Sequence, residues 1–230
     1  GSTGKGLINS YLAWKNKPEI ISCTNMANAG HTAILPDGTK FVAKALPSSA
    51  ILNNKDDYKP TVVLGSSCAF TIEQLYHEWT ICDYPDVAIH PRAGVITKEH
   101  AQRENDLSSG TKHIASTMQG CGACLSDKIM RGPNVKLAKD YAEVVAFTAN
   151  DEALPLSLIN RLKNGQTILH EGSQGFSLDI HHGSHYPQCT SRSCTVGQSM
   201  TDMGIPHTMV GDVYLVVRPY PIRVGNVVEN

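Results

Sequence analysis

The sequence predicts an α/β protein whose central sheet is mainly parallel and is flanked by helices. Two observations indicate this fold class. Short apolar runs typical of buried strands alternate along the chain with segments of helical apolar spacing, as in strands joined by helical crossovers. In addition, 230 residues with 41% hydrophobic composition can bury a real core, as one large domain or two small ones.

The first part of the chain contributes the first helix and strands. Apolar spacing predicts a helix over Leu7–Trp14, and the run EIISCT predicts a buried strand over Glu19–Thr24. A turn at Asp37 and Gly38 precedes a predicted strand over Thr39–Leu46. The expected order is then strand, helix, strand, over Thr61–Gly65, Thr71–Ile81 and Asp86–His90.

The second part continues the alternation. We expect a helix over Asp151–Lys163, a strand over Thr167–Gly172 and a last strand over Asp212–Arg218. The Gly-rich segment Ser116–Lys128 is the most loop-like interior stretch, because glycine and small polar residues interrupt both periodicities.

Composition excludes several classes of function. The formal net charge is −1, so no global basic field attracts nucleic acid or acidic membranes. The longest apolar runs, such as Val213–Val217, are far too short to span a bilayer. Seven cysteines, an odd number spread among core-forming segments, favour reduced thiols. We therefore expect a cytoplasmic protein without nucleic-acid or membrane partners.

The chain opens with GSTGKG, Gly1–Gly6, directly before the predicted first helix. Glycines let backbone N–H groups face an anion, the helix N-terminus adds partial positive charge, and Lys5 adds a full charge. The complete phosphate-loop pattern has Ser or Thr after the lysine, where this chain has Gly6. Because many turns contain Gly-Lys-Gly, this loop alone is weak evidence for phosphate binding.

A second stretch, Asn25–Ile34 (NMANAGHTAI), follows a predicted strand. In α/β sheets, ligands bind at the carboxyl ends of strands. Asn28, His31 and Thr32 bring an amide, a titratable ring and a hydroxyl together, and Gly30 allows close approach of the backbone. The alternative interpretation is a loop with one solvated histidine.

A third stretch, Glu171–Arg192, also follows an apolar strand and combines Gln, Ser, Asp, His and Thr. Its histidines suggest zinc, but structural zinc sites usually need four ligands. Neither this stretch nor the single Cys-x-x-Cys pair at Cys121 has the usual paired spacing. We therefore predict no metal cluster of that kind.

Taken in order, these stretches resemble the adenylosuccinate synthetase family. GSTGKGLI resembles the family's G-D-E-G-K-G-K-I loop, NAGHT is identical to its N-A-G-H-T loop, and KALPSSAI resembles its H-L-L-P-S-G-I stretch. Three further segments match: STMQGCGACLSDKIMRG, EGSQGFSLDIHHGSHYPQCTSR and YPIRVGN. The resemblance covers essentially the whole chain and implies the family's α/β fold with its P-loop-like phosphate loop.

The family transfers a γ-phosphoryl group to a purine 6-oxygen, and the amine of aspartate then displaces phosphate. By resemblance, the triphosphate binds at Gly1, Ser2, Thr3, Gly4, Lys5, Gly6, Gly30, His31 and Thr32. The monophosphate substrate binds at Ser2, Asn28, Ala29, Ser116, Thr117, Arg131, Gln174 and Thr190. The implied catalytic residues are Ser2, His31 as general acid, and Gln174 at the base edge. Arg131 is expected to act from the other subunit of a homodimer.

Ser2 departs from the cellular members, which have a catalytic aspartate at this position. Phage members that make 2-aminoadenine nucleotides share the serine, together with pieces matching Gly175–Leu178 and Cys189–Thr195. This resemblance implies a ligase that joins aspartate to C6 of dGMP with ATP or dATP, in the host cytoplasm. The implied cofactor is Mg²⁺, held by Ser2 and the backbone carbonyl of Gly30. Which group takes the N1 proton in place of the aspartate stays open.

The family has a strand before the position of Gly1 and continues beyond the position of Asn230 with an aspartate-binding loop. We therefore expect residues 1–230 to form a single domain of this fold that lacks the first strand and the C-terminal part. Two alternatives stay open. One is a cellular-type enzyme that acts on IMP with GTP, which Ser2 opposes, and the other is a non-catalytic nucleotide-binding fragment.

Overall fold

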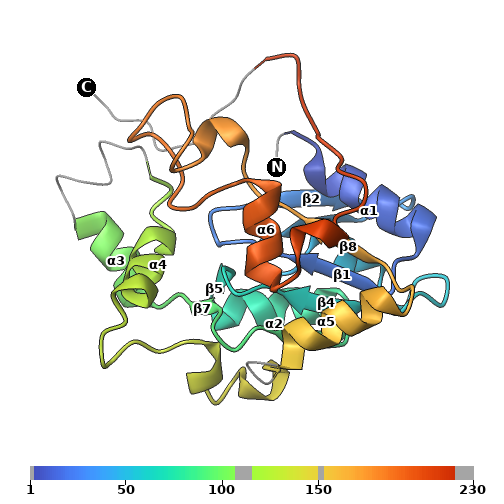
Figure 1. Ribbon diagram of the computed structural model, residues 1–230, viewed down its shortest axis with the longest axis horizontal. Coiled ribbons are helices and arrows are strands. Elements are labelled where there is room, and N and C mark those ends of the chain that lie inside the picture. Colours follow the sequence, from blue (N-terminus) through green and yellow to red (C-terminus); the bar gives the residue numbers. More distant parts are fainter. Residues whose placement is uncertain (1–2, 107–115, 150–152, 221–230) are drawn as a thin grey trace.

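The computed structural model describes residues 3–106, 116–149 and 153–220. Its centre is a four-stranded sheet in the order β6-β4-β1-β8, in which each neighbouring pair is parallel. The prediction of a mainly parallel sheet is confirmed (Figure 1). The strands are β1 (Ile20–Cys23), β4 (Thr61–Leu64), β6 (Val87–Ile89) and β8 (Ile168–Glu171).

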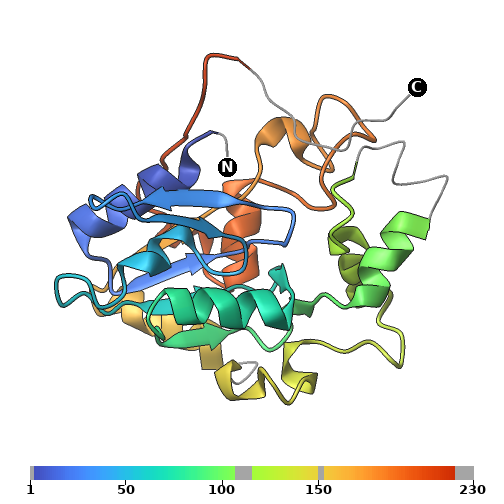
Figure 2. The same ribbon diagram turned by 180° about the vertical axis from the view of Figure 1, so that it is seen from behind.

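Helices cover both faces of this sheet (Figures 1 and 2). One face is covered by α1 (Lys5–Asn16), α2 (Ile72–Ile81) and the 3-10 helix η1 (Ser48–Leu52), and the other by α5 (Ala153–Lys163) and α6 (Val196–Met203). Successive strand residues point to opposite faces, so Ile21 joins the first core and Ile20 the second.

Strands β2 (His31–Ile34) and β3 (Lys40–Ala43) form an antiparallel hairpin beside α1. Gly38 has a φ of +85° in the turn, a conformation that glycine adopts without steric cost. The ladder ends where the buried carboxylate of Glu78 accepts hydrogen bonds from three successive backbone N–H groups, those of residues 44–46. These hydrogen bonds fix the backbone of the segment that connects the hairpin to η1.

A second group of elements lies to one side of the sheet (Figure 1). It contains β5 (Ala69–Phe70), β7 (Gly94–Val95), α3 (Lys98–Asp106) and α4 (Cys121–Met130). Cys121 and Cys124 pack against Met26, so α4 begins against the chain that follows β1. The remaining short helices are η2 (Ala138–Asp140), η3 (Val145–Phe147), η4 (Phe176–Leu178) and η5 (His207–Met209).

Helix α1 has an unusual distribution of residues between its two faces. Its buried residues are small or polar: Gly6, Asn9, Ser10 and Ala13. Four of its five large apolar residues lie on the solvent side, where Leu7, Ile8, Tyr11 and Trp14 are 38–52% exposed, while Leu12 is half-buried. The usual arrangement of an amphipathic helix is therefore reversed, with most of the large apolar residues outside and small or polar residues inside. The small side chains let the helix approach the sheet and η1 closely.

Two predictions about elements are wrong. Asp212–Arg218 is extended but pairs with no described strand, and Leu215 and Val217 are 80% and 82% exposed. An apolar run has the same sequence pattern whether or not a sheet edge is available to it. Ser116–Lys128 is not a loop throughout, because α4 starts at Cys121 after Gly120 takes a φ of +78° as its N-cap.

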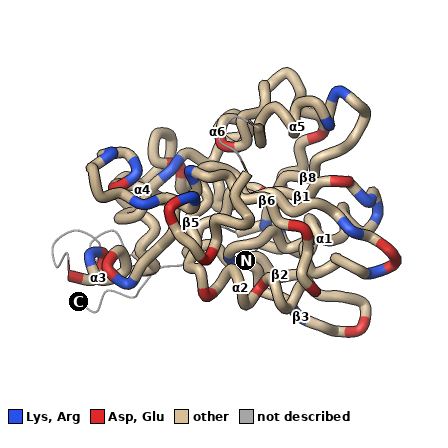
Figure 3. The backbone as a smooth tube through the Cα atoms, turned by 90° about the horizontal axis from the view of Figure 1, so that it is seen from below, with Lys and Arg blue, Asp and Glu red and all other residues tan. Residues whose placement is uncertain are grey.

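Other predicted elements are confirmed with shifted ends. The first helix is longer than predicted, β3 is shorter, and the predicted loop Asn25–Ile34 ends in strand β2. The predicted helix start at Asp151 lies outside the described residues. Acidic and basic residues are interspersed over the described chain (Figure 3), and no helix within it has the length and apolarity that a membrane crossing requires.

Candidate active site

The N-terminus of α1 has the backbone form of an anion site. Gly4 is its N-cap with a φ of +90°, and Lys5 is the first helical residue. No side chain caps the helix, so its first N–H groups have no side-chain acceptor there. Burial lowers the pKa of Lys5, while the nearby Glu171 carboxylate acts in the opposite direction. Thr3 is half-buried beside this turn.

Gly6 packs directly against the start of β2. A β-carbon at Gly6 would lie 2.6 Å from the Thr32 carbonyl oxygen, 2.7 Å from the Thr32 nitrogen and 2.9 Å from the His31 carbonyl carbon. All three are backbone atoms, which cannot move aside as a flexible side chain can. This contact explains why glycine follows Lys5, and it brings the first two sequence stretches together.

His31 is the first residue of β2 and only 3% exposed. Its Nδ1 lies 2.5 Å from Oε1 of Glu171, the last residue of β8. The distance is that of an ion pair, although the atoms are not aligned as a hydrogen bond. Glu171 was quoted in the motif EGSQG but assigned no role from the sequence.

Glu171 accepts hydrogen bonds from three donor groups of two other elements, η1 and α1. Its carboxylate accepts hydrogen bonds from the Ser48 backbone N–H at 2.6 Å, the Ser48 hydroxyl at 2.9 Å and the Asn9 side-chain amide at 3.0 Å. Burial acts to raise the pKa of Glu171, but the adjacent His31 and the Ser48 donors outweigh it and hold the pKa below its usual value. The carboxylate is therefore charged at neutral pH.

Two of the predicted monophosphate residues, Asn28 and Thr190, lie on segments that meet at the start of α4. The thiol of Cys121, at the start of α4, interacts with the Asn28 backbone, and a β-carbon at Gly122 would lie 3.8 Å from that of Ser191. Asn28 Oδ1 and Thr190 Oγ1 are buried and find no hydrogen-bond partner within the described chain. Buried polar groups are usually paired, so two unpaired ones in one region favour a ligand there.

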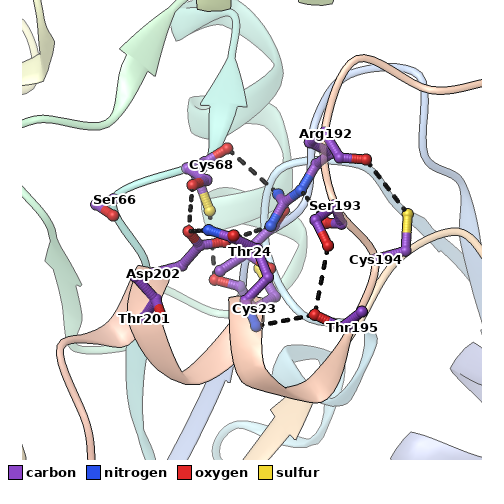
Figure 4. Close-up of polar contacts among 12 residues, drawn as sticks. Cys23, Thr24, Ser66, Cys68, Arg192, Ser193, Cys194, Thr195, Thr201 and Asp202 are labelled. Carbon is purple, nitrogen blue, oxygen red and sulfur yellow. Dashed lines mark hydrogen bonds and ion pairs between the residues drawn. The ribbon is translucent and has the colours of Figure 1, made fainter. Parts of the chain in front are cut away.

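An arginine of the neighbouring loop contacts this region through several polar groups (Figure 4). Arg192 donates to the Thr24 carbonyl at 2.6 Å, beyond the end of β1, and forms a buried ion pair with Asp202 of α6. Asp202 also accepts from the Ser67 hydroxyl at 2.5 Å, in the turn after β4. The Arg192–Asp202 pair thus connects the ends of β1 and β4 to the loop that contains Thr190.

The histidine-rich stretch is held by its backbone. Buried Asp179 accepts from the backbone N–H groups of His181, His182 and Cys194 and from the Ser193 hydroxyl. Burial acts to raise the pKa of Asp179, but these donors hold it well below its usual value. Among the described residues, no three His, Cys, Asp or Glu side chains gather as metal ligands.

The other predicted residues occupy varied positions. Ala29 is buried in the loop before β2, and Gly30 is half-buried there. Ser116 and Thr117 are half-buried ahead of α4, and Gln174 has a φ of +68° in the loop after β8. Arg131 is exposed at the opposite end of α4, about 15 Å along its axis from Cys121. Gly1 and Ser2 lie outside the described residues.

A glycine turn at a helix N-terminus, beside the carboxyl ends of a parallel sheet, is typical of α/β proteins that bind phosphate groups. The family model for adenylosuccinate synthetase matches residues 1–143 and 133–228. The chain belongs to the adenylosuccinate synthetase family, as the sequence resemblance predicts.

Relatives come from phages and from cells. The N6-succino-2-amino-2′-deoxyadenylate synthase of Vibrio phage phiVC8 is 37% identical over 98% of this chain and 66% of that protein. The adenylosuccinate synthetase of Archaeoglobus fulgidus is 32% identical over 98% of this chain and 64% of that protein. Among solved structures, the cyanophage S-2L succinoaminodeoxyadenylate synthetase bound to dGMP and dATP aligns with a TM-score of 0.77 and 30% identity, over 91% of this chain and 58% of that one.

The chain thus spans just under two thirds of the length of the curated relatives that it matches, 66% and 64% for the first two.

Proposed function

We propose that the protein is an ATP-dependent ligase that joins aspartate to C6 of dGMP and releases ADP and phosphate. The observation that favours this substrate over IMP is the higher identity to the Vibrio phage synthase, 37%, than to the archaeal adenylosuccinate synthetase, 32%. Ser2, which the phage members share, supports the same choice. Such a reaction takes place in the cytoplasm of the infected cell.

The first step transfers the γ-phosphoryl group of ATP or dATP to the 6-oxygen, and the aspartate amine then displaces phosphate from C6. Phosphoryl transfer needs mainly positioning and charge stabilisation. Lys5 and the N-terminal N–H groups of α1 hold the triphosphate, with Gly30 and Thr32 beside them. His31 donates a hydrogen bond to the transferring group and acts as general acid, and Gln174 holds the base edge.

The 5′-phosphate of dGMP binds between Asn28, Thr117 and Thr190. The unpaired buried atoms of Asn28 and Thr190 support this assignment. Arg131 reaches the same phosphate from the second subunit of a homodimer. Its position at the far end of α4, beside the exposed Ile129 and Met130, agrees with a role at an interface rather than in its own site.

Mg²⁺ is the proposed cofactor. Magnesium commonly binds through substrate phosphates, waters and only one or two protein oxygens. The Gly30 carbonyl, next to the predicted triphosphate site, and the Ser2 hydroxyl fit such a sparse oxygen site. When bound, the ion would offset negative charge on the phosphate groups.

The test is a turnover assay of the purified protein with dGMP, ATP and aspartate, run beside IMP, GTP and aspartate. We expect the succinyl adduct of dGMP together with ADP and phosphate. Turnover of IMP with GTP instead would support the cellular-type enzyme. Nucleotide binding without turnover of either set would support a non-catalytic protein.

A further inference from the structure

Glu171 is the buried charge in the site that the proposed chemistry does not yet use. It is 3% exposed and comes from the last position of β8, at the edge where the strands end. A charged carboxylate is costly to bury unless several donors satisfy it. A charged carboxylate buried beside a predicted catalytic histidine therefore indicates that its negative charge acts on that histidine.

The donors around Glu171 fix where its oxygens lie. Ser48 provides both its backbone N–H and its hydroxyl from η1, and Asn9 provides its amide from α1. Ser48 and Asn9 are both buried and belong to different elements. The carboxylate therefore cannot rotate without breaking its hydrogen bonds to η1 and α1. The carboxylate is a rigid support.

That support contacts one particular atom of His31. Nδ1 lies 2.5 Å from Oε1 of Glu171, and Nε2 makes no hydrogen bond with any described residue. A neutral imidazole holds a single proton, whereas the imidazolium form has a proton on each ring nitrogen. A carboxylate at Nδ1 favours the form with both protons, in which Nδ1–H faces Glu171 and Nε2–H can donate to the bound nucleotide.

We propose that Glu171 is the positioning residue for His31: it fixes the plane of the imidazole and stabilises the form with a proton on each ring nitrogen, so that Nε2–H faces the transferring phosphoryl group. The proposal rests on the role given to His31 in the proposed function. Glu171 itself contacts no substrate, and it acts only through the ring it holds.

The principal test is a double-mutant cycle in the turnover assay. We expect His31→Asn to lower kcat by about two to four orders of magnitude, the usual range for a positioned acid or base. Glu171→Gln should lower kcat by at least about tenfold and by less than His31→Asn does, with KM for dGMP nearly unchanged, because the histidine remains but is no longer held in place. In the His31→Asn background, Glu171→Gln should cost little more, because residues that act as a unit are not additive.

A matched control separates positioning from folding. Glu78→Gln also neutralises a buried carboxylate that accepts backbone hydrogen bonds, but Glu78 shares no hydrogen bond with His31 or Glu171. It should lower the melting temperature without the selective loss of kcat. Full additivity of Glu171→Gln and His31→Asn, or equal kinetic losses in both glutamine variants at matched stability, would overturn the proposal.

A readout without turnover tests the contact itself. A buried imidazole N–H exchanges slowly with water, so His31 should give a low-field N–H resonance that is absent from His31→Asn. The resonance should be lost or strongly shifted in Glu171→Gln and retained in Glu171→Asp. An unchanged resonance in Glu171→Gln contradicts the proposal, whereas an inactive wild type with the expected resonances contradicts only the proposed function.

Discussion

Among single residues, Lys5 belongs to no core cluster, but we predict that triphosphate binding depends on it. It is the first residue of α1, where it adds a full charge to the helix N-terminus. We expect Lys5→Ala to abolish triphosphate binding or turnover, because charged groups make the strongest contacts to phosphate. Lys15→Ala, in the last turn of the same helix, is the control and should retain binding. Equal affinity for ATP in wild type and Lys5→Ala would remove the phosphate-loop assignment.

Ser2 should set the choice of purine. A carboxylate near N1 leaves less room for the 2-amino group of guanine than serine does, and a site that pairs such a group rejects an analogue without it. We predict that wild type prefers dGMP over dIMP. Ser2→Asp should move the ratio of kcat/KM toward dIMP by about 1–3 kcal/mol, the effect of one unpaired buried polar group. Undiminished dGMP preference in Ser2→Asp would place selection elsewhere.

Single residues also mark the limit of sequence analysis. NAGHT identifies His31 because its residues are contiguous. Glu171 was visible in EGSQG, yet its partners Asn9, Ser48 and His31 come from three distant segments. Only the packing of α1 and η1 against the end of β8 brings them together, and no local pattern reports such packing. A charged residue at the end of a predicted apolar strand was the one available signal.

Among the elements, the contact between α1 and β2 is open to a direct test. Gly6→Ala would place a β-carbon 2.6 Å from the Thr32 carbonyl oxygen, so backbone must shift. We expect a loss of about 1–3 kcal/mol in the free energy of unfolding, typical of overpacking, together with weaker ATP binding. Gly211→Ala, where no heavy atom lies within 4 Å of the added carbon, is the control. Equal stability of both variants would show that the two segments are not in contact.

Helices and strands with clear apolar periodicity could be predicted from the sequence, but the side of each element that faces the core could not. Apolar spacing located α1, but the same spacing suggests that Leu7 and Trp14 face the core, whereas both are about half exposed, at 47% and 52%. The buried face is built from Asn9, Ser10 and small residues, since it packs closely on η1, where the Asn9 amide donates to the hydroxyls of Ser48 and Ser49. The run at Val213–Val217 has strand composition without a pairing partner among the described strands. The spacing of apolar residues indicates which secondary structure a segment favours, but the segments that pack against it determine which of its faces is buried and whether a strand pairs.

The whole molecule should lose stability in moderately acidic solution. Burial lowers the pKa of His170 from 6.5 to about 4, and Arg192 acts in the same direction while Asp202 opposes it. Between these values the unfolded chain binds more protons than the folded one, so the free energy of unfolding falls as pH falls from about 6.5 to about 4. The slope from this group approaches about 1.4 kcal/mol per pH unit.

His170→Asn should flatten this slope, because it removes the titrating ring and leaves an amide that can bond to the Ser22 hydroxyl, which now contacts Nδ1 at 2.9 Å. Urea unfolding at several pH values measures the effect, and His77→Asn replaces an exposed histidine on α2 for comparison. A slope identical in wild type and His170→Asn would assign the acid sensitivity to other groups.

Subunit exchange tests the proposed assembly. In an isologous dimer each site can borrow a residue from its partner. We expect Arg131→Leu and Lys5→Ala to be inactive separately, and their mixture to recover activity through hybrid dimers that contain one intact site. No recovery after demonstrated subunit exchange would indicate that Arg131 acts in its own subunit or has no role.

The reversed amphipathicity of α1 has an optical consequence. The chain has two tryptophans, and Trp14 lies on the solvent side of α1, 52% exposed, about 13 Å along the axis from Lys5. Trp79 is instead partly enclosed on α2 and donates its indole N–H to the Pro85 carbonyl at 3.0 Å. A soluble quencher such as iodide will therefore reach one fluorophore far more readily than the other. The helix that begins at the proposed phosphate loop therefore contains its own fluorescent reporter, Trp14, and replacing Trp79 by phenylalanine would leave Trp14 as the single tryptophan.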